Sequence, residues 1–173
     1  MIIKISNLRD GVHNLSFDEN ISEIGVDEPF YGNCNVEVEL SKSHSQIVLN
    51  AVLTLNAKYQ CDRCGCDLKS TVKTDYQMVY LFSKEWNYTG SEPEDSGNIN
   101  LTYLPVDADK IDIANDVRDY ALIAIPMKKL CKEDCKGLCA SCGKDLNYGE
   151  CGCTKDEADP RWQPLEKLRN KLN

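Results

Sequence analysis

Ten cysteines constrain this chain more than any other feature, because their spacing is compatible with few kinds of fold. Six of them fall within residues 131–153, and two Cys-x-x-Cys pairs occupy residues 61–64 and 139–142. Two cysteines separated by two residues can bind one metal ion from a tight turn, whereas an even number of cysteines in a secreted chain indicates a disulfide framework. The full set is Cys34, Cys61, Cys64, Cys66, Cys131, Cys135, Cys139, Cys142, Cys151 and Cys153.

The cellular compartment favours metal sites over disulfides. Residues 1–6 lack the basic leader and the continuous apolar stretch of a secretory signal. No uncharged apolar run is long enough to cross a bilayer. We therefore expect a cytoplasmic protein with no membrane contact, and thiols stay reduced in the cytoplasm.

Four cysteines are close enough in sequence to form one site by themselves. Eight residues separate Cys142 from Cys151, and a loop of that length can reverse direction at a low cost in closure entropy. Zinc takes four soft ligands in a tetrahedron, with Zn–S bonds of about 2.3 Å. The spacing therefore predicts one structural zinc ion on Cys139, Cys142, Cys151 and Cys153.

A second zinc site needs residues that are distant in sequence. Cys61 and Cys64 lie at the tip of an expected hairpin, and Cys131 and Cys135 follow an expected helix. We favour a site made of these four, which would fix the end of the helix to the hairpin tip. The alternative is a simple zinc ribbon, which pairs residues 61–64 with residues 139–142 and leaves the other four cysteines for the second site.

Two cysteines are left over, and a glycine follows each Cys-x-x-Cys pair. Cys34 is expected to be a small apolar residue at the start of a strand. Cys66 can replace Cys64 in a shifted pair, but the turn favours Cys64. Gly65 and Gly143 tolerate the positive φ that such turns often need.

Three other interpretations of the cysteines compete with structural zinc. No thioredoxin-like βαβ pattern surrounds either pair, which argues against a redox pair. A catalytic zinc usually has histidine ligands, but His13 and His44 lie in polar turns and are expected at the surface. Iron–sulfur ligation is compatible with so many thiols. We find no phosphate-binding loop and no nucleophile–base arrangement, so neither an enzyme nor a small-molecule substrate is expected.

Period-two patterns predict β-strands in the first half of the chain. Apolar and polar side chains alternate in residues 36–40, 47–59 and 68–82, which gives each strand one buried face. Three successive strands with short connections predict an antiparallel meander. Residues 7–29 are expected to form turns and loops, and residues 84–100 a solvated loop.

The second half of the chain predicts a helix and short segments. Asp112 is the expected N-cap of a helix whose apolar residues recur at helical spacing until Pro126. Short strands are expected at residues 2–5 and 100–105. Pro164 suits the first turn of a last helix.

These patterns together predict an α+β fold. It consists of an antiparallel β-sheet or partly closed barrel with a packed helix, followed by a C-terminal zinc-ribbon-like segment. The expected domains are residues 1–126 for the sheet and helix, and residues 127–173 for the cysteine-rich zinc-binding segment with its helix. Two structural zinc ions are the expected cofactors.

Charge is distributed unevenly along the acidic chain, whose formal net charge is −8. Residues 1–60 carry four Lys/Arg and eight Asp/Glu, and residues 61–127 carry six and twelve. Residues 128–173 carry ten and eight. The acidic part should repel a phosphate backbone and can attract a basic protein. If the chain contacts RNA, the C-terminal quarter is the expected surface.

Residues 131–147 resemble the YceD family, as do Cys151-Gly-Cys153 and residues 159–168, which begin Asp-Pro-Arg-Trp. The Cys61-x-Arg-Cys64 pair after a long alternating strand also fits, whereas Gly65-Cys66 departs from the leucine that often follows this pair. The resemblance implies a bacterial or plastid protein without established enzymatic activity. It also implies a role in accumulation of 23S ribosomal RNA and in assembly of the large ribosomal subunit.

The resemblance also bears on the metal sites. Some members of the family lack the cysteine set of residues 139–153 and keep the first pair with a ligand-like segment after the helix. This supports grouping Cys61 and Cys64 with Cys131 and Cys135, and it makes the second site an elaboration.

The matching C-terminal segment contains candidate contacts to a partner. Trp162 either packs the last helix or stacks on RNA, and Arg161 supplies charge beside it. The exposed face of the expected last helix adds Lys167, Arg169 and Lys171. Expected partners are ribosomal RNA or a basic large-subunit ribosomal protein. The alternative hypothesis is a zinc- or thiol-responsive regulatory binding module.

Overall fold

The computed structural model describes residues 1–83 and 100–153. These residues belong to two compact units. The first unit contains Met1–Asp62 and Cys66–Cys131, and the second contains Arg63–Gly65 and the described residues from Lys132 onward. The expected domain boundary at residue 126 stays a prediction. The last helix expected from Pro164 lies outside the described residues.

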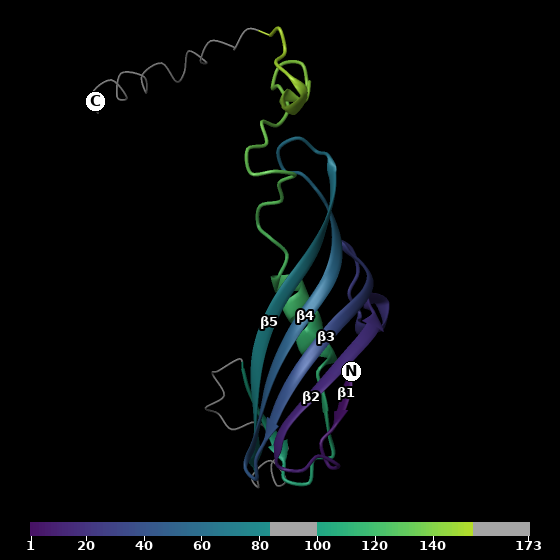
Figure 1. The fold of residues 1–173 in the computed structure, drawn as a ribbon, viewed down its shortest axis with the longest axis vertical. Helices are drawn as coiled ribbons and strands as arrows, with labels where there is room; N and C mark the ends of the chain where they lie inside the picture. The colour runs from purple at the N-terminus through teal and green to yellow at the C-terminus, as the bar shows by residue number, and fades with distance from the viewer. Residues whose placement is uncertain (84–99, 154–173) are drawn as a thin grey trace, which may run out of the picture. The chain divides into compact units, whose positions relative to one another are not determined.

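The first unit is built on a five-stranded sheet with the order β2-β3-β4-β5-β6 (Figure 1). Its strands are β2 (Gly11–Asn20), β3 (Phe30–Lys42), β4 (Gln46–Gln60), β5 (Asp67–Ser83) and β6 (Leu101–Pro105). Pairing is antiparallel from β2 to β5, whereas β6 runs parallel to β5. In the described ranges β2 and β6 are the two edges, so the sheet is open and forms no closed barrel.

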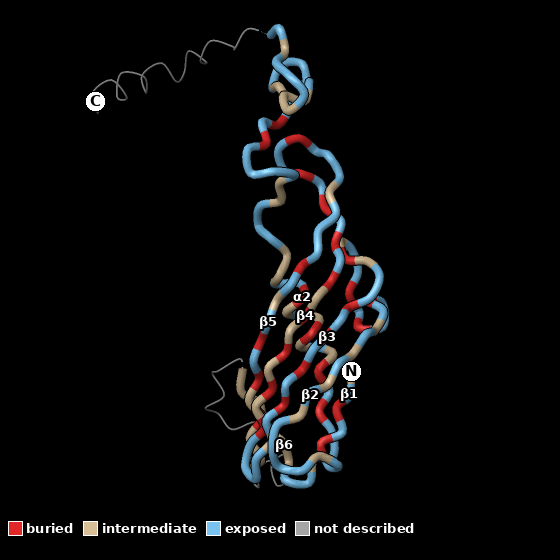
Figure 2. Tube along the Cα trace, in the orientation of Figure 1, coloured by how far each residue is buried: buried red, intermediate tan, exposed pale blue. Residues whose placement is uncertain are grey.

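The predicted meander of three strands is confirmed as β3, β4 and β5. Its strict alternation gives one face of buried side chains, and Val38, Ala51 and Tyr76 lie side by side across the three strands. Figure 2 shows buried and exposed residues alternating along these strands. Because successive side chains point to opposite faces, a sequence with period two builds a sheet that buries one side.

The expectation that residues 7–29 form only turns and loops is wrong, because β2 occupies ten of them. β2 pairs with β3 along its whole length, from Gly11 opposite Lys42 to Asn20 opposite Asn33. Its inward residues Leu15 and Phe17 are only half-buried. An edge strand of this kind has a weak apolar pattern, which hid it in the sequence.

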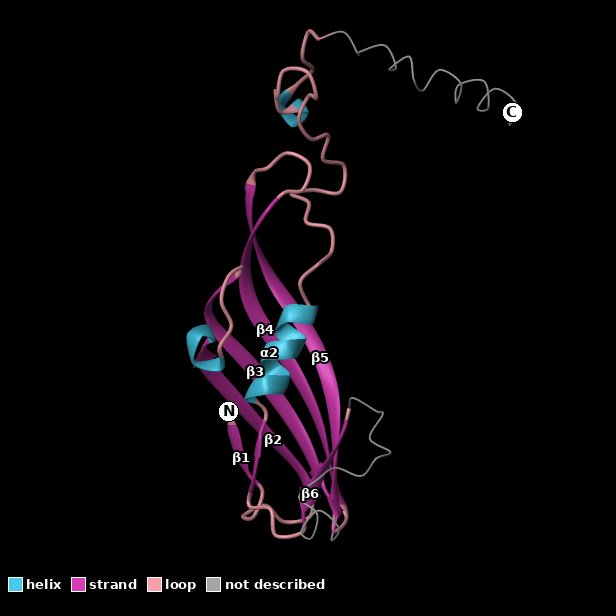
Figure 3. Cartoon of the chain, turned by 180° about the vertical axis from the view of Figure 1, so that it is seen from behind, coloured by secondary structure: helices cyan, strands magenta, loops and turns pink. Residues whose placement is uncertain are grey.

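A helix and a small second sheet cover the buried face of the large sheet. The helix α2 (Ala114–Ile123) contacts β4 and β5 and places Val117 and Ala121 in the core. Figure 3 shows α2 lying across this face. β1 (Ile2–Lys4) and β7 (Lys110–Asp112) pair antiparallel, and each adds a buried isoleucine to the same core.

The predicted helix between Asp112 and Pro126 is confirmed, with a shift of one residue in its cap. The N-cap position is Ile113, whose side chain makes no capping bond. Asp112 accepts a hydrogen bond from the backbone N–H of Ala114 at 3.0 Å, and it also meets the N-terminal amine at 3.3 Å. That backbone bond is the largest reason why the pKa of Asp112 is lowered from its usual value.

The opposite face of the sheet is exposed, with acidic residues in its middle and two lysines toward one end. Glu37, Glu39 and Asp75 project from its middle, whereas Lys58 and Lys69 lie near the end of the β4–β5 hairpin. Among the described residues, no helix has the length and the apolar character needed to cross a bilayer.

Candidate metal centres

Eight cysteines lie in two groups of four whose sulfur atoms can each surround one metal ion. The first tetrad is Cys61, Cys64, Cys131 and Cys135, and the second tetrad is Cys139, Cys142, Cys151 and Cys153. Within each group all Sγ atoms lie within 4.8 Å of one another. Tetrahedral Zn–S bonds of about 2.3 Å would place sulfur atoms roughly 3.8 Å apart. Both groups therefore suit a zinc-sized ion after a small contraction.

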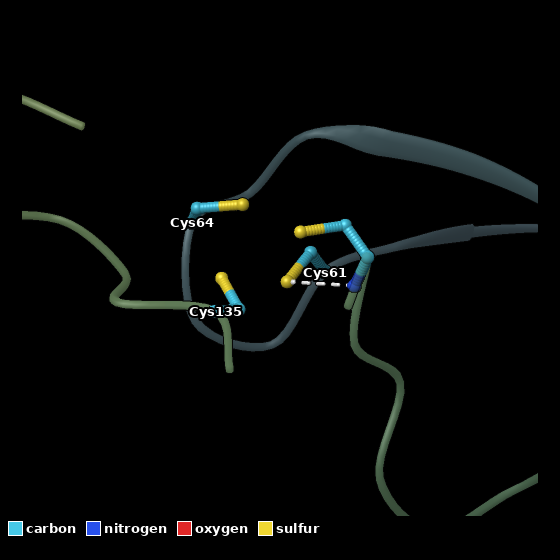
Figure 4. Close-up of side chains that lie close together, drawn as sticks. Cys61, Cys64 and Cys135 are labelled. Atoms are coloured by element: carbon cyan, nitrogen blue, oxygen red, sulfur yellow. Dashed lines mark hydrogen bonds between the residues drawn. The ribbon is translucent and has the colours of Figure 1, made fainter. Parts of the chain in front are cut away.

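The turn at the end of the β4–β5 hairpin presents two thiols of the first tetrad. The backbone N–H of Cys61 donates to the carbonyl of Cys66 at 2.9 Å, which closes the turn. Gly65 has φ of +71°, so the positive φ predicted after this pair is confirmed. Figure 4 shows the sulfur atoms of Cys61, Cys64 and Cys135 turned toward a common point.

A reciprocal pair of hydrogen bonds holds this turn to the segment that follows α2. The backbone N–H of Asp62 donates to the carbonyl of Lys129 at 2.8 Å. The carboxylate of Asp62 accepts from the backbone N–H of Lys129 at 2.6 Å. Two residues later, the N–H of Cys131 donates to Sγ of Cys61 at 3.4 Å. A hydrogen bond to sulfur favours the thiolate, which is the form that binds metal.

Cys135 is held by side chains that the sequence analysis did not single out. Its carbonyl accepts a 2.6 Å hydrogen bond from the guanidinium of Arg63. Its sulfur accepts one from the side-chain amide of Asn147 at 3.3 Å. The Asn147 carbonyl oxygen in turn accepts from the N–H of Lys136 at 2.9 Å. Partners of this kind orient metal ligands, and only their polar character and nearness in sequence could have indicated them.

The second tetrad is built from a short loop that folds on itself. The N–H of Cys139 donates to the carbonyl of Lys144 at 2.8 Å, and the N–H of Gly143 donates back to Cys139 at 2.9 Å. Gly143 has φ of +73°, which confirms the second predicted positive φ. The 3-10 turn η2 (Leu146–Tyr148) then reverses the chain toward Cys151 and Cys153.

The thiols of the second tetrad differ in acidity because of their neighbours. Hydrogen bonds from the backbone N–H of Cys142, and then from the thiol of Cys151, lower the pKa of Cys139 to about 6. Hydrogen bonds with the thiols of Cys142 and Cys151 raise the pKa of Cys153 to about 12. Four thiols this close together cannot all lose their protons easily, because the resulting thiolates repel one another. A bound dication would offset that repulsion.

The two tetrads differ most in burial. In the first tetrad three cysteines are buried, with exposed fractions between 1% and 8%: Cys61, Cys64 and Cys135. The fourth, Cys131, is exposed to solvent. In the second tetrad no thiol is buried, and Cys142 and Cys153 are exposed. A metal ion in the second tetrad would therefore be more accessible to water, chelators and oxidants.

The remaining candidate residues lie apart from both tetrads. Cys34 is fully buried in the core, as expected of a small apolar residue, and burial raises its pKa to about 11. Cys66 is exposed. His13 is half-buried and contacts the carbonyl of Arg9 at 2.8 Å, whereas His44 is exposed, so neither belongs to a metal group among the described residues.

The family model for the large ribosomal RNA subunit accumulation protein YceD matches residues 49–169 of this chain. The chain belongs to the YceD family. All eight cysteines of the two tetrads fall inside the matched range. The resemblance that the cysteine pattern indicated is therefore confirmed.

Named relatives are found in plants and in mycobacteria. The chain is 22% identical, over 79% of its length, to the chloroplastic YCED homolog 1 of Arabidopsis thaliana. It is 36% identical, over 68% of its length, to the corresponding protein of Zea mays. It is 25% identical, over 93% of its length, to an uncharacterized protein of Mycobacterium tuberculosis H37Rv.

These relatives are longer than the matched part. The chain aligns with 49% of the Arabidopsis protein, 47% of the maize protein and 72% of the mycobacterial one, so it spans about half the length of the plant relatives. No solved structure matches the chain. The predicted partner contacts Arg161, Trp162, Lys167, Arg169 and Lys171 lie outside the residues that the structure describes.

Proposed function

We propose that this protein is a non-enzymatic bacterial factor, active in the cytoplasm, for accumulation of 23S ribosomal RNA and assembly of the large ribosomal subunit. The observation that carries the proposal is membership of the YceD family, which is named for accumulation of large-subunit ribosomal RNA. Each tetrad holds one structural zinc ion in this proposal. The donor chemistry supports zinc, because four thiolates form the closed site that structural zinc prefers.

The same donor sets support a function without catalysis. A catalytic zinc needs a coordination position that is open to water or substrate. Four cysteine ligands occupy all four positions of a tetrahedron, and both groups supply four. The ions in this proposal fix loops, and the surfaces of the protein perform the function by binding.

The distribution of charge supports two different partners, a basic protein on the sheet and RNA on the C-terminal segment. The exposed middle of the large sheet carries Glu37, Glu39 and Asp75, which favours a basic large-subunit ribosomal protein. The C-terminal residues Arg161, Trp162, Lys167, Arg169 and Lys171 supply charge and stacking for ribosomal RNA.

Depletion of the protein in its host tests the proposed function. We expect mature 23S ribosomal RNA and large subunits to fall while 16S ribosomal RNA is retained, and plasmid-borne wild type to restore both. Gradient profiles and RNA blots measure this. Unchanged 23S levels and an unchanged subunit profile after depletion would exclude the proposal.

The RNA contact of the C-terminal segment has a separate test. Replacement of Lys167, Arg169 and Lys171 by glutamine should reduce the ribosomal RNA that crosslinks to the protein in cells. Replacement of three exposed lysines of the sheet unit, Lys4, Lys73 and Lys110, by glutamine is the charge-matched control. Equal crosslinking in both variants would argue against the C-terminal contact.

A second candidate function follows from the exposure of the second tetrad. Exposed, metal-bound thiolates react with oxidants, so this site can report zinc or redox state to a binding partner. Rapid alkylation of Cys142 and Cys153 in the zinc-loaded protein would favour this zinc- or thiol-responsive module. Slow alkylation until a chelator is added would favour purely structural zinc.

A further inference from the structure

Two lysines face each other at the exposed end of the β4–β5 hairpin. Lys58 and Lys69 are direct partners in the register of the two strands, and both are exposed. Like charges opposite each other on one face of a sheet are destabilising unless something of opposite charge lies between them. Beside them the side-chain amide of Gln60 donates to Asp67 at 3.5 Å, and among the described residues neither ammonium group has an ion-pair partner.

An aromatic ring stands beside this pair. Tyr31 of β3 is half-buried on the same face, opposite Asn56. The ammonium of Lys58 lies 5.0 Å from the centre of the Tyr31 ring, within the range of a cation–π contact. Ammonium groups next to an aromatic ring match the two parts of a nucleotide, because the phosphate meets the charge and the base meets the ring.

The lysines and the ring line an open depression of about 950 Å³ in the first unit. Its walls come from residues 28–31, 58–60 and 67–69. Tyr59 also lines it, but as the strand neighbour of Lys58 it turns its side chain to the opposite, buried face of the sheet, so Lys58, Lys69 and Tyr31 are the part that faces solvent together.

We propose that this depression binds a single-stranded segment of RNA, with Lys58 and Lys69 on its phosphates and Tyr31 stacked on a base. This surface rests on the proposed function and adds to it an RNA contact within the acidic unit. The expectation that the C-terminal quarter contacts RNA stays a prediction, and this depression is proposed as an additional contact.

Acidic side chains that line the same depression limit the kind of RNA that it can bind. Glu28 and Asp67 line the same depression, so a long duplex laid across it would meet repulsion as well as attraction. The geometry therefore favours a single strand over a duplex.

A binding measurement on the full, zinc-loaded chain tests the proposal. The probe is a fluorescein-labelled, mixed-sequence RNA of twelve nucleotides, followed by anisotropy at several salt concentrations. The variant K58Q/K69Q should bind about tenfold more weakly, and its plot of log affinity against log salt should be shallower by about 1.4 for two lost phosphate contacts. Tyr31→Ala should weaken binding about fivefold or more, with the salt slope unchanged.

The chain offers a matched control for the lysine variant. Lys4 and Lys110 are also exposed and directly opposite each other, in the β1–β7 pair, but they do not line this depression. K4Q/K110Q changes the net charge by the same amount and should leave affinity within twofold. Thermal melts of both variants separate loss of binding from loss of fold.

Each other outcome overturns the proposal. Equal affinity of K58Q/K69Q and K4Q/K110Q would assign binding to net charge alone. Equal binding of a labelled poly-glutamate peptide, dependent on Lys58 and Lys69, would assign the surface to an acidic protein. If wild type does not bind the RNA, this surface is not an RNA contact, whereas the 23S level after depletion still decides the proposed function separately.

Discussion

Glycines after the two Cys-x-x-Cys pairs show how single residues set the metal geometry. Gly65 and Gly143 both adopt a left-handed φ, near +71° and +73°. A residue with a Cβ atom pays roughly 1–2 kcal/mol in that conformation. A glycine directly after a Cys-x-x-Cys pair therefore indicates, from sequence alone, a turn that needs a positive φ.

Gly143→Ala should weaken zinc binding by the second tetrad about tenfold, because the loop must take on backbone strain to present Cys139 and Cys142. Competition with a chromogenic chelator measures the affinity. Gly152→Ala is the control, since Gly152 lies between two cysteines of the same tetrad with no positive φ and with open space around it. Similar losses in both variants would contradict the strain argument.

Asp62 binds no metal in the proposed sites, but it holds the turn of the first tetrad to the segment after α2. Its carboxylate accepts the 2.6 Å hydrogen bond from Lys129, so Asp62→Ala should lower the free energy of unfolding by about 1 kcal/mol and the melting temperature by roughly 2–4 °C. Asp62→Asn, which keeps an acceptor, should lose less. Asp67→Ala at the other end of the turn is the control, and an equal loss there would refute the assignment.

At the scale of elements, α2 is fixed to the sheet by aromatic and polar contacts. Tyr120 of α2 stacks on Tyr76 of β5, with ring centres 4.4 Å apart. Tyr80 of β5 donates to the carboxylate of Asp116 at 3.4 Å. Burial, more than the neighbouring acids Asp119 and Asp112, raises the pKa of Asp116.

Asp116→Asn should raise stability at neutral pH. Because the folded-state pKa of Asp116 is raised, its contribution is favourable at pH values below the unfolded pKa and is lost as pH rises through the folded pKa. Asparagine removes that loss and keeps an acceptor for Tyr80, so the melting temperature at pH 7 should rise by about 2 °C. The gain should vanish near pH 3, and a gain that persists there would contradict this cause.

The first tetrad should matter more to the fold than the second. C61S/C64S removes thiols from the turn that joins the two longest strands, whereas C139S/C142S affects a loop with few buried residues. We expect the melting temperature to fall by more than 10 °C in the first case and by only a few degrees in the second. Calorimetry of zinc-loaded proteins measures both, and the reverse order would contradict the prediction.

Sequence patterns predicted those elements whose pattern is strong and local. The meander of β3 to β5 followed from strict alternation, and α2 from helical spacing up to Pro126. β2 escaped prediction because His13 interrupts its inward apolar series and its edge position leaves Leu15 and Phe17 only half-buried. The β1–β7 pair joins Ile3 to Ile111, and no short-range pattern indicates a partner that far along the chain.

In the candidate sites, too, the residues with a strong local pattern were predicted and those that depend on the fold were not. Spacing alone indicated the eight clustered thiols and already favoured one of two groupings, which the family resemblance then supported. Asn147 and Arg63 were not foreseen, because their roles depend on where the loop of η2 places Cys135. The depression at Lys58, Lys69 and Tyr31 was missed because it joins three segments whose neighbourhood appears only in the folded sheet.

At the scale of the whole molecule, the two proposed zinc ions would leave an already acidic chain more negative. Each zinc tetrathiolate carries a charge of −2, so two of them take the formal net charge from −8 to about −12. Long-range repulsion of RNA should therefore be strong at low salt. The proposed contact with RNA would then depend on local clusters of cations rather than on overall charge.

If both tetrads hold zinc, a chelator should remove the ion of the second tetrad before that of the first. The second tetrad is more exposed, so its zinc should be lost at least tenfold faster than that of the first tetrad. Native mass spectrometry should show two zinc ions per chain, then a persistent species with one. C139S/C142S should begin at one ion and skip the fast phase, and a fast phase in that variant would contradict the order.

The wide separation within the first tetrad has a consequence for synthesis. Cys131 comes 70 positions after Cys61, so at about 5–20 residues per second a ribosome takes roughly 4–14 seconds to supply the first missing ligand. During that interval the hairpin presents two thiols alone. The second tetrad, which spans residues 139–153, is completed within about 3 seconds at the same rates. The nascent chain therefore passes through a brief stage in which its longest hairpin competes for zinc as a two-coordinate site.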